Sequence, residues 1–138
     1  MILQESMPAA LPVTLTACAA SGLIVLWLGM RIGKLRGSLK VSVGDGGHES
    51  LQRRMRAQLN FVEYTPFVLL LIAAIEINNQ GESWLPYVAG AFLLSRVAHA
   101  IGMDGGKLGI CRNIGIMVTM LTLLGLSVYA VLIAARIV

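Results

Sequence analysis

The chain has 138 residues and a formal net charge of +4; 57% of its residues are hydrophobic and 13% are charged. A soluble domain carries about twice that fraction of charged residues, and here the apolar residues form long blocks. The composition therefore excludes an ordinary soluble domain and indicates an all-α integral membrane protein. The positive residues gather at the edges of the apolar blocks without a nucleic-acid-binding motif, so no nucleic-acid partner is expected.

Four apolar blocks follow one another, and each has about the 20 residues that a helix needs to cross a hydrocarbon core of about 30 Å. They predict a four-transmembrane-helix bundle with helices at approximately 11–31, 56–77, 84–103 and 112–136. Within the first and last blocks, the stretches Leu11 to Met30 and Asn113 to Ala135 carry no charged side chain. The second and third contain Asn60, Glu63, Arg96 and His99, which hydrocarbon does not readily tolerate.

The basic residues predict the orientation of the bundle, because connections rich in Lys and Arg stay on the cytoplasmic side. The first connection and its edges hold seven of the eleven basic residues: Arg31, Lys34, Arg36, Lys40, Arg53, Arg54 and Arg56. The third connection adds Lys107 and Arg112, whereas the charges of the second are Glu76 and Glu82. Both termini are therefore expected on the non-cytoplasmic side.

A polar stripe runs along the second helix into its apolar part. At about 100° per residue, Arg53, Arg56, Asn60 and Glu63 fall on one helix face, and Phe67 continues the line. Ionisable residues inside a membrane span indicate a functional site by default. On the third helix, neighbouring positions three residues apart carry another polar pair, Arg96 and His99.

Two interpretations account for these polar residues. In the structural one, Glu63 pairs with Arg96 or Arg56, Asn60 forms hydrogen bonds between helices worth about 1 kcal/mol each, and Arg112 reaches the lipid headgroups. In the functional one, the concentration of such groups in the cytoplasmic halves of three helices binds a small, partly anionic ligand. Arginines meet its carboxylates and Glu63 meets its ammonium group. Glutathione, with two carboxylates, one ammonium and a thiol, has these groups.

The segment Arg56–Pro66 follows the pattern Arg-Ala-Gln-x-Asn-x-x-Glu-Tyr-x-Pro and closely resembles the second-helix signature of the MAPEG family, the membrane-associated proteins in eicosanoid and glutathione metabolism. Arg96-Val97-Ala98-His99 resembles the third-helix motif of the prostaglandin-synthase branch, and Arg112 follows at that branch's spacing. The run Val41–Gly47 is similar to the first loop of bacterial members. The chain thus resembles a bacterial-type member related to microsomal glutathione transferase.

The resemblance implies one MAPEG-like domain over residues 1–138, assembled as a homotrimer, with glutathione bound between protomers near the cytoplasmic side. Arg112 is the implied catalytic residue beside the thiol. The implied glutathione-binding residues are Arg31, Arg56, Gln58, Asn60, Glu63, Tyr64, Arg96 and His99, of which Arg31 rests on its location alone. No metal is implied.

A fixed positive charge beside a thiol raises the fraction of thiolate, the nucleophilic form. The expected function is therefore conjugation of glutathione to lipophilic electrophiles, with reduction of lipid hydroperoxides, in a bacterial inner membrane. Two alternatives stay open. One is a non-catalytic regulatory member that binds lipid or glutathione. The other is a small multidrug transporter, which needs a membrane-embedded carboxylate on its substrate path, and the first helix offers none.

Overall fold

The computed structural model describes residues 11–138 apart from 79 and 82. Within these residues it contains four α-helices and a short 3-10 turn, η1 (Gly106–Leu108), and no strand. The helices are α1 (Pro12–Leu39), α2 (Glu49–Ile77), α3 (Leu85–Gly102) and α4 (Gly109–Ala134). Each is long and apolar enough to cross a membrane. The predicted all-α membrane protein with four transmembrane helices is confirmed.

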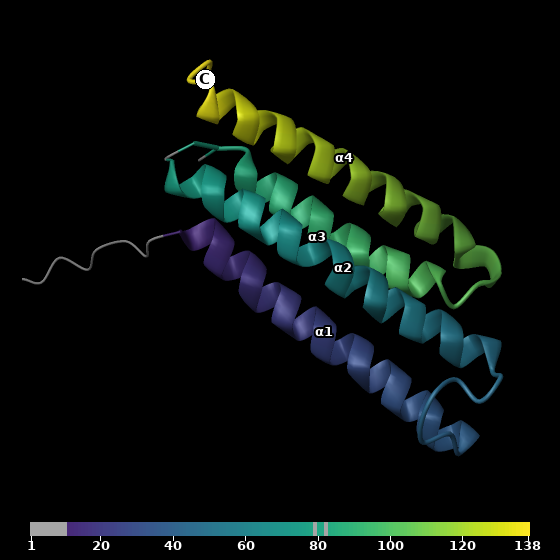
Figure 1. Ribbon diagram of the computed structural model, residues 1–138. Coiled ribbons are helices and arrows are strands. Elements are labelled where there is room, and N and C mark those ends of the chain that lie inside the picture. Colours follow the sequence, from purple (N-terminus) through teal and green to yellow (C-terminus); the bar gives the residue numbers. More distant parts are fainter. Residues whose placement is uncertain (1–10, 79, 82) are drawn as a thin grey trace, which may run out of the picture.

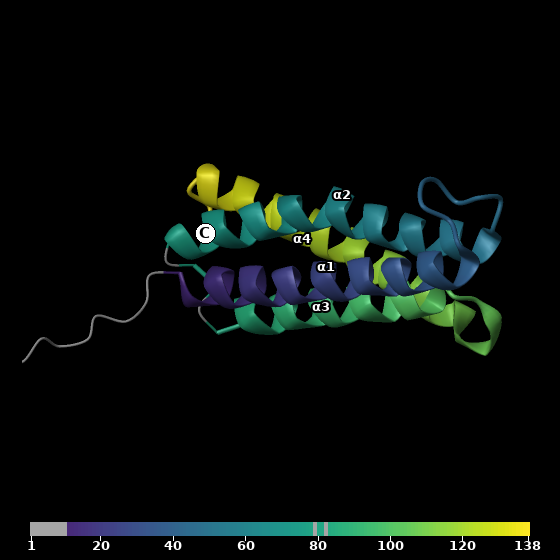
Figure 2. The same cartoon turned by 90° about the horizontal axis from the view of Figure 1, so that it is seen from below.

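The helices run alternately up and down, as Figure 1 shows. α3 packs mainly on α4 and α1 mainly on α2, whereas α1 and α4 lie at opposite edges and share no contact between described residues (Figures 1 and 2). The α1–α2 connection and the α3–α4 turn lie together at one end of the bundle. We call this the loop end; the start of α1 and the end of α4 lie at the other end.

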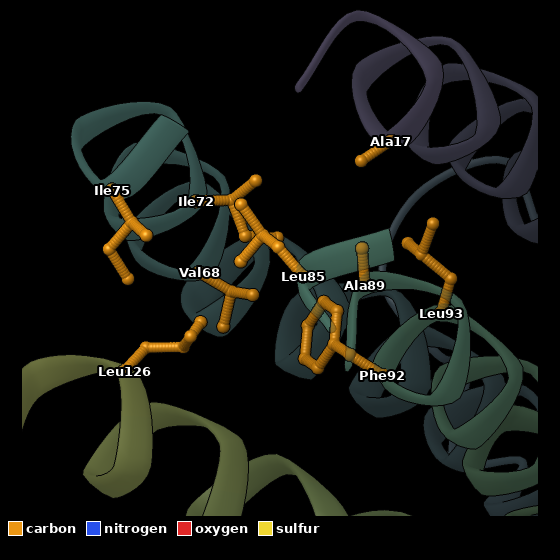
Figure 3. Close-up of a cluster of buried hydrophobic side chains, with 9 residues drawn as sticks. All are labelled: Ala17, Val68, Ile72, Ile75, Leu85, Ala89, Phe92, Leu93 and Leu126. Atoms are coloured by element: carbon orange, nitrogen blue, oxygen red, sulfur yellow. The ribbon is translucent and has the colours of Figure 1, made fainter. Parts of the chain in front are cut away.

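An apolar core fills the half of the bundle away from the loop end. In Figure 3, Phe92 of α3 lies among Val68 and Ile72 of α2 and Leu126 of α4, and the first three of these side chains are fully buried. Lipid tails are as apolar as these residues, so close van der Waals packing holds the helices together here. The core fixes how the polar halves of α2, α3 and α4 meet.

Two helix ends differ from the sequence prediction. α1 continues to Leu39 instead of ending near 31, and α2 begins at Glu49 instead of near 56. Both boundaries were predicted at the charged residues next to the apolar block, and each prediction was wrong by about two turns. Arg, Lys, Leu, Gln and Glu are good helix formers, so both helices extend beyond the apolar blocks. Glu49 in the first turn of α2 also complements the positive end of the helix dipole.

α1 is held at its start by a residue from another helix. Both carboxylate oxygens of Glu76, near the end of α2, accept hydrogen bonds from the backbone N–H groups of Val13 and Thr14 at 2.8 Å. The hydroxyl of Thr14 donates a third bond at 2.6 Å. The N-cap residue Leu11 has no side-chain acceptor, so Glu76 satisfies the free N–H groups of the first turn instead.

An ionic cluster at the loop end joins α1, α2 and the α3–α4 turn. Asp104 pairs with Arg31 of α1 and, at 3.1 Å, with Arg54 of α2. Arg31 also donates to the carbonyl of Ala100 at 3.2 Å and lies 4.7 Å from the ring centroid of Trp27. Arg54 in turn donates to the carbonyl of Arg31 at 3.0 Å. Arg31, an implied glutathione ligand, is thus bound within its own protomer.

Candidate functional site

Arg96 is the centre of the polar half of the bundle. Its side chain is buried, with the residue only 2% exposed, and its guanidinium donates to two other helices. One terminal nitrogen bonds the Asn60 Oδ1 of α2 at 2.7 Å, and the other bonds the Thr119 Oγ1 of α4 at 2.6 Å. The hydroxyl of Thr119 donates onward to the carbonyl of Gly115 at 2.8 Å. A buried positive charge is therefore held by uncharged acceptors.

The structural interpretation of the sequence is only half right. Asn60 does form a hydrogen bond between helices. The partners of Arg96, however, are the amide of Asn60 and the hydroxyl of Thr119 rather than Glu63. Glu63 is exposed, and among residues 11–138 without 79 and 82 it forms no ion pair with Arg56 or Arg96. The one acidic group of the polar cluster therefore does not neutralise its arginines.

Small residues bring α4 directly against α3 at the same depth. A Cβ on Gly115 would lie 2.5 Å from the Cβ of His99 and 2.7 Å from the backbone oxygen of Ser95. A Cβ on Gly102 would overlap the backbone of Arg112. Gly therefore allows the start of α4, with Arg112, to lie beside the end of α3.

Two buried nitrogen atoms of the site have no partner among the described residues. They are Nε of Arg96 and Nδ1 of His99, and both side chains belong to residues at most 3% exposed. The residues lie three apart on one face of α3. A buried polar group without a hydrogen bond costs about 1–3 kcal/mol, so these atoms favour a polar binding partner over a purely apolar environment.

The other implied residues of α2 lie at or near the surface of the protomer. Arg56 and Glu63 are exposed, one turn before and one turn after Asn60, which is half-buried like Tyr64. Arg112 on α4 is also exposed. Exposed charges on the side of a membrane helix call for a covering protein surface or a polar ligand, because hydrocarbon solvates them poorly.

Gln58 lies on the opposite side of α2, toward α1, and close to Gly29. It lines a cavity of about 660 Å³ between α1 and α2, near the loop end. Polar side chains of Arg36, Asp45, Gln52, Arg56 and Gln58 share the cavity wall with apolar ones. The implied residues therefore fall into two groups in one protomer. Asn60, Arg96 and His99 face the α2–α3–α4 side, whereas Arg56 and Gln58 line the α1–α2 side.

Thr119 and the contact between Arg54 and Asp104 were not predicted from the sequence. Thr119 stands in an apolar helix four residues after Gly115, a spacing typical of a threonine bonded to its own backbone. That signal does not show that an arginine from another helix also uses the hydroxyl. Arg54 and Asp104 read as ordinary loop charges because their contact joins residues 50 positions apart.

Comparisons with known proteins agree with this architecture. The sequence model of the MAPEG family matches residues 14–132. The inner membrane protein YecN of Escherichia coli strain K12 is 34% identical to the chain over 83 residues, which are 59% of this chain and 63% of that protein. The protein of the same name from Escherichia coli O6:H1 gives the same values. The match thus spans less than two thirds of the length of these curated relatives.

Proposed function

The chain belongs to the MAPEG family, and on that premise we propose that it is a membrane-bound glutathione transferase. It activates the thiol of glutathione for conjugation to lipophilic electrophiles and for reduction of lipid hydroperoxides. Its relative YecN is named as an inner membrane protein, which supports the same location for this chain.

The observation that carries the proposal is which groups accept the hydrogen bonds of the Arg96 guanidinium. Its two hydrogen-bond partners are neutral. Among the implied site residues of α2, α3 and α4, Arg56, Arg96 and Arg112 carry positive charge and only Glu63 carries negative charge, and Glu63 forms no ion pair with another described residue. A surplus of guanidinium groups beside an amide suits a ligand with two carboxylates. The exposed carboxylate of Glu63 suits its ammonium group.

Arg112 is the proposed activating residue. A free thiol has a pKa of about 8.5, so only a small fraction is ionised at neutral pH, and a nearby guanidinium raises that fraction. In conjugation, the thiolate sulfur forms a bond to the electrophilic carbon, and a leaving group departs with its electron pair or the adduct takes up a proton. With a hydroperoxide, the sulfur attacks the terminal oxygen, the O–O bond breaks, and the alkoxide leaves and takes up a proton to become the alcohol. A second glutathione then attacks the sulfenic acid, which gives the disulfide and water.

We place the site between protomers of a homotrimer. The two groups of implied residues lie on different faces of one chain, Gln58 toward α1 and Asn60 toward α3 and α4. Contact between those faces of neighbouring protomers covers the exposed charges of α2 and completes one site. Native mass spectrometry in mild detergent is expected to give three copies of the 14.7 kDa chain. A monomer that binds glutathione would contradict the shared site.

A titration of the purified protein with glutathione in detergent tests the function. The wild type is expected to bind at millimolar glutathione or below, and Arg56→Ala to bind about tenfold more weakly because a charge-assisted hydrogen bond is lost. Arg53→Ala is the matched control, because Arg53 is exposed and paired with Glu49 at 2.6 Å. Absence of binding by the wild type at millimolar glutathione overturns the proposal.

The ultraviolet absorbance of bound thiolate separates the enzyme from the regulatory alternative. The wild-type complex is expected to show the thiolate band at neutral pH, whereas Arg112→Ala binds glutathione without it. Conjugation of a reactive aryl halide should fall in parallel with the band. Binding without thiolate in the wild type favours a non-catalytic member of the family.

A further inference from the structure

Thr119 is a polar residue at the centre of the site to which the proposed function gives no role. It is fully buried in α4, and its hydroxyl donates to the carbonyl of Gly115. The only remaining role for that oxygen is to accept a bond, and it accepts one from Arg96 at 2.6 Å. The direction of both hydrogen bonds is therefore fixed by chemistry.

The same reasoning fixes the side chain of Asn60. A guanidinium has donors and no acceptor, so the amide of Asn60 must turn its oxygen toward Arg96, at 2.7 Å. The reverse orientation would place N–H groups against N–H groups. The NH2 group of Asn60 is thereby left to donate elsewhere, and it bonds no other described residue. Arg56 and Glu63 lie one turn to either side of it on α2.

We propose that Thr119 is a positioning residue for glutathione. It anchors Arg96, and Arg96 orients the amide of Asn60 so that the NH2 group is presented to one carboxylate of the ligand. The inference rests on the proposed function and extends it to a residue on α4 that touches no ligand. Without the Thr119 anchor, the guanidinium turns about its long side chain and the amide of Asn60 loses its single orientation.

Isothermal titration with three ligands tests this role. They are glutathione, its glycine monoethyl ester, and the analogue that lacks the α-carboxylate of the glutamyl residue. Thr119→Val keeps the side-chain shape and removes the hydroxyl. We expect it to weaken glutathione binding about tenfold, the effect of one hydrogen bond to a charged group. For the ligand that lacks the carboxylate bound by Asn60, the substitution should have no effect, because that bond is already absent.

Controls separate positioning from damage to the bundle. Thr122→Val changes a half-buried threonine of the same helix that bonds no other described side chain, and it should leave all three affinities unchanged. Thr119→Ser keeps the hydroxyl that Thr119→Val lacks, so it should bind glutathione with the affinity of the wild type. Asn60→Asp keeps the acceptor for Arg96 but removes the donor, so adding Thr119→Val to it should cause no further loss.

The outcomes distinguish this inference from the function on which it rests. Lack of glutathione binding by the wild type would contradict both the proposed function and the positioning role of Thr119. Wild-type binding with an equal loss for all three ligands in Thr119→Val shows a general packing role and overturns the positioning role alone. Unchanged glutathione affinity in a folded Thr119→Val protein does the same.

Discussion

Gly115 shows how one missing side chain permits the polar network. Its backbone accepts the hydroxyl of Thr119, while its Cα faces α3 so closely that a Cβ would meet the backbone oxygen of Ser95 at 2.7 Å. A flexible side chain could turn away from such a contact, but a backbone atom moves only with its helix. The distance between α3 and α4 at the depth of Arg96 therefore depends on Gly115.

We predict that Gly115→Ala destabilises the bundle by about 1–3 kcal/mol, the usual cost of overpacking. The measurement is the free energy of unfolding in mixed micelles of mild and denaturing detergent. Gly125→Ala on the same helix is the control, because a Cβ there meets nothing within 4 Å. That change should be neutral or stabilise by up to about 1 kcal/mol through helix propensity. Equal losses in both variants would show that the contact with α3 is unimportant.

At the scale of the elements, α1 depends on α2 for its first turn. Glu76 accepts three hydrogen bonds there, two of them from backbone N–H groups that the helix itself leaves free. A carboxylate at this position also interacts favourably with the positive end of the helix dipole. Loss of a capping side chain costs about 1 kcal/mol.

We therefore predict that Glu76→Gln lowers the free energy of unfolding by about 1 kcal/mol and speeds amide hydrogen exchange in the first turn of α1. Glu49→Gln is the comparison. Glu49 pairs with Arg53 on the surface, where its side chain is 73% exposed, and such pairs contribute little. The cap would be disproved by exchange rates at Val13 and Thr14 that match those of the wild type.

The cluster of Arg31, Arg54 and Asp104 closes the loop end in a comparable way. The Arg31 side chain is 14% exposed and that of Asp104 is 40% exposed, so solvent screens the pair only in part. We predict that a double-mutant cycle of Arg31→Gln and Asp104→Asn gives a coupling energy of roughly 1 kcal/mol. Arg36→Gln with Asp104→Asn should be additive, because Arg36 bonds Gly44 and Met55 instead. Additive effects in the first cycle would show that the Arg31–Asp104 pair does not contribute to stability.

The elements were predictable because their signals are local. The length of the four apolar blocks gave the helices, and residue spacing placed Asn60 on one face of α2 and Arg96 on one face of α3. The partners of Arg96 were not predictable in full. Charge alone favoured Glu63, but the choice of Asn60 and Thr119 depends on the rotation and axial position of α2 and α4 around α3, which no spacing within one helix encodes. The contact of Glu76 with Thr14, across 62 positions, was missed for the same reason.

At the scale of the whole molecule, the larger apolar core and the buried charged network lie in different halves of the bundle, although a smaller apolar cluster of Leu28, Ala57, Phe61 and Ala100 lies beside the network. The core around Phe92 fills one half (Figure 3), while Arg96, His99 and the ionic cluster of Asp104 occupy the half toward the loop end. The same end carries the two connections that are rich in Lys and Arg. If those connections are cytoplasmic, the proposed glutathione site opens toward the compartment where glutathione is abundant and reduced.

We predict that the α1–α2 connection is cytoplasmic and that the α2–α3 connection faces outward. The free cysteines Cys18 and Cys111 are first replaced by Ser, and a single Cys is introduced at Ser42 or at Ser83, both of which are exposed. In intact cells, a membrane-impermeant maleimide should label Ser83→Cys and not Ser42→Cys, because the basic connection stays inside. After permeabilisation both should react, which controls for accessibility. Labelling of Ser42→Cys alone in intact cells would invert the topology and place the polar half of the bundle, with Arg96 and Arg112, on the side away from cytoplasmic glutathione.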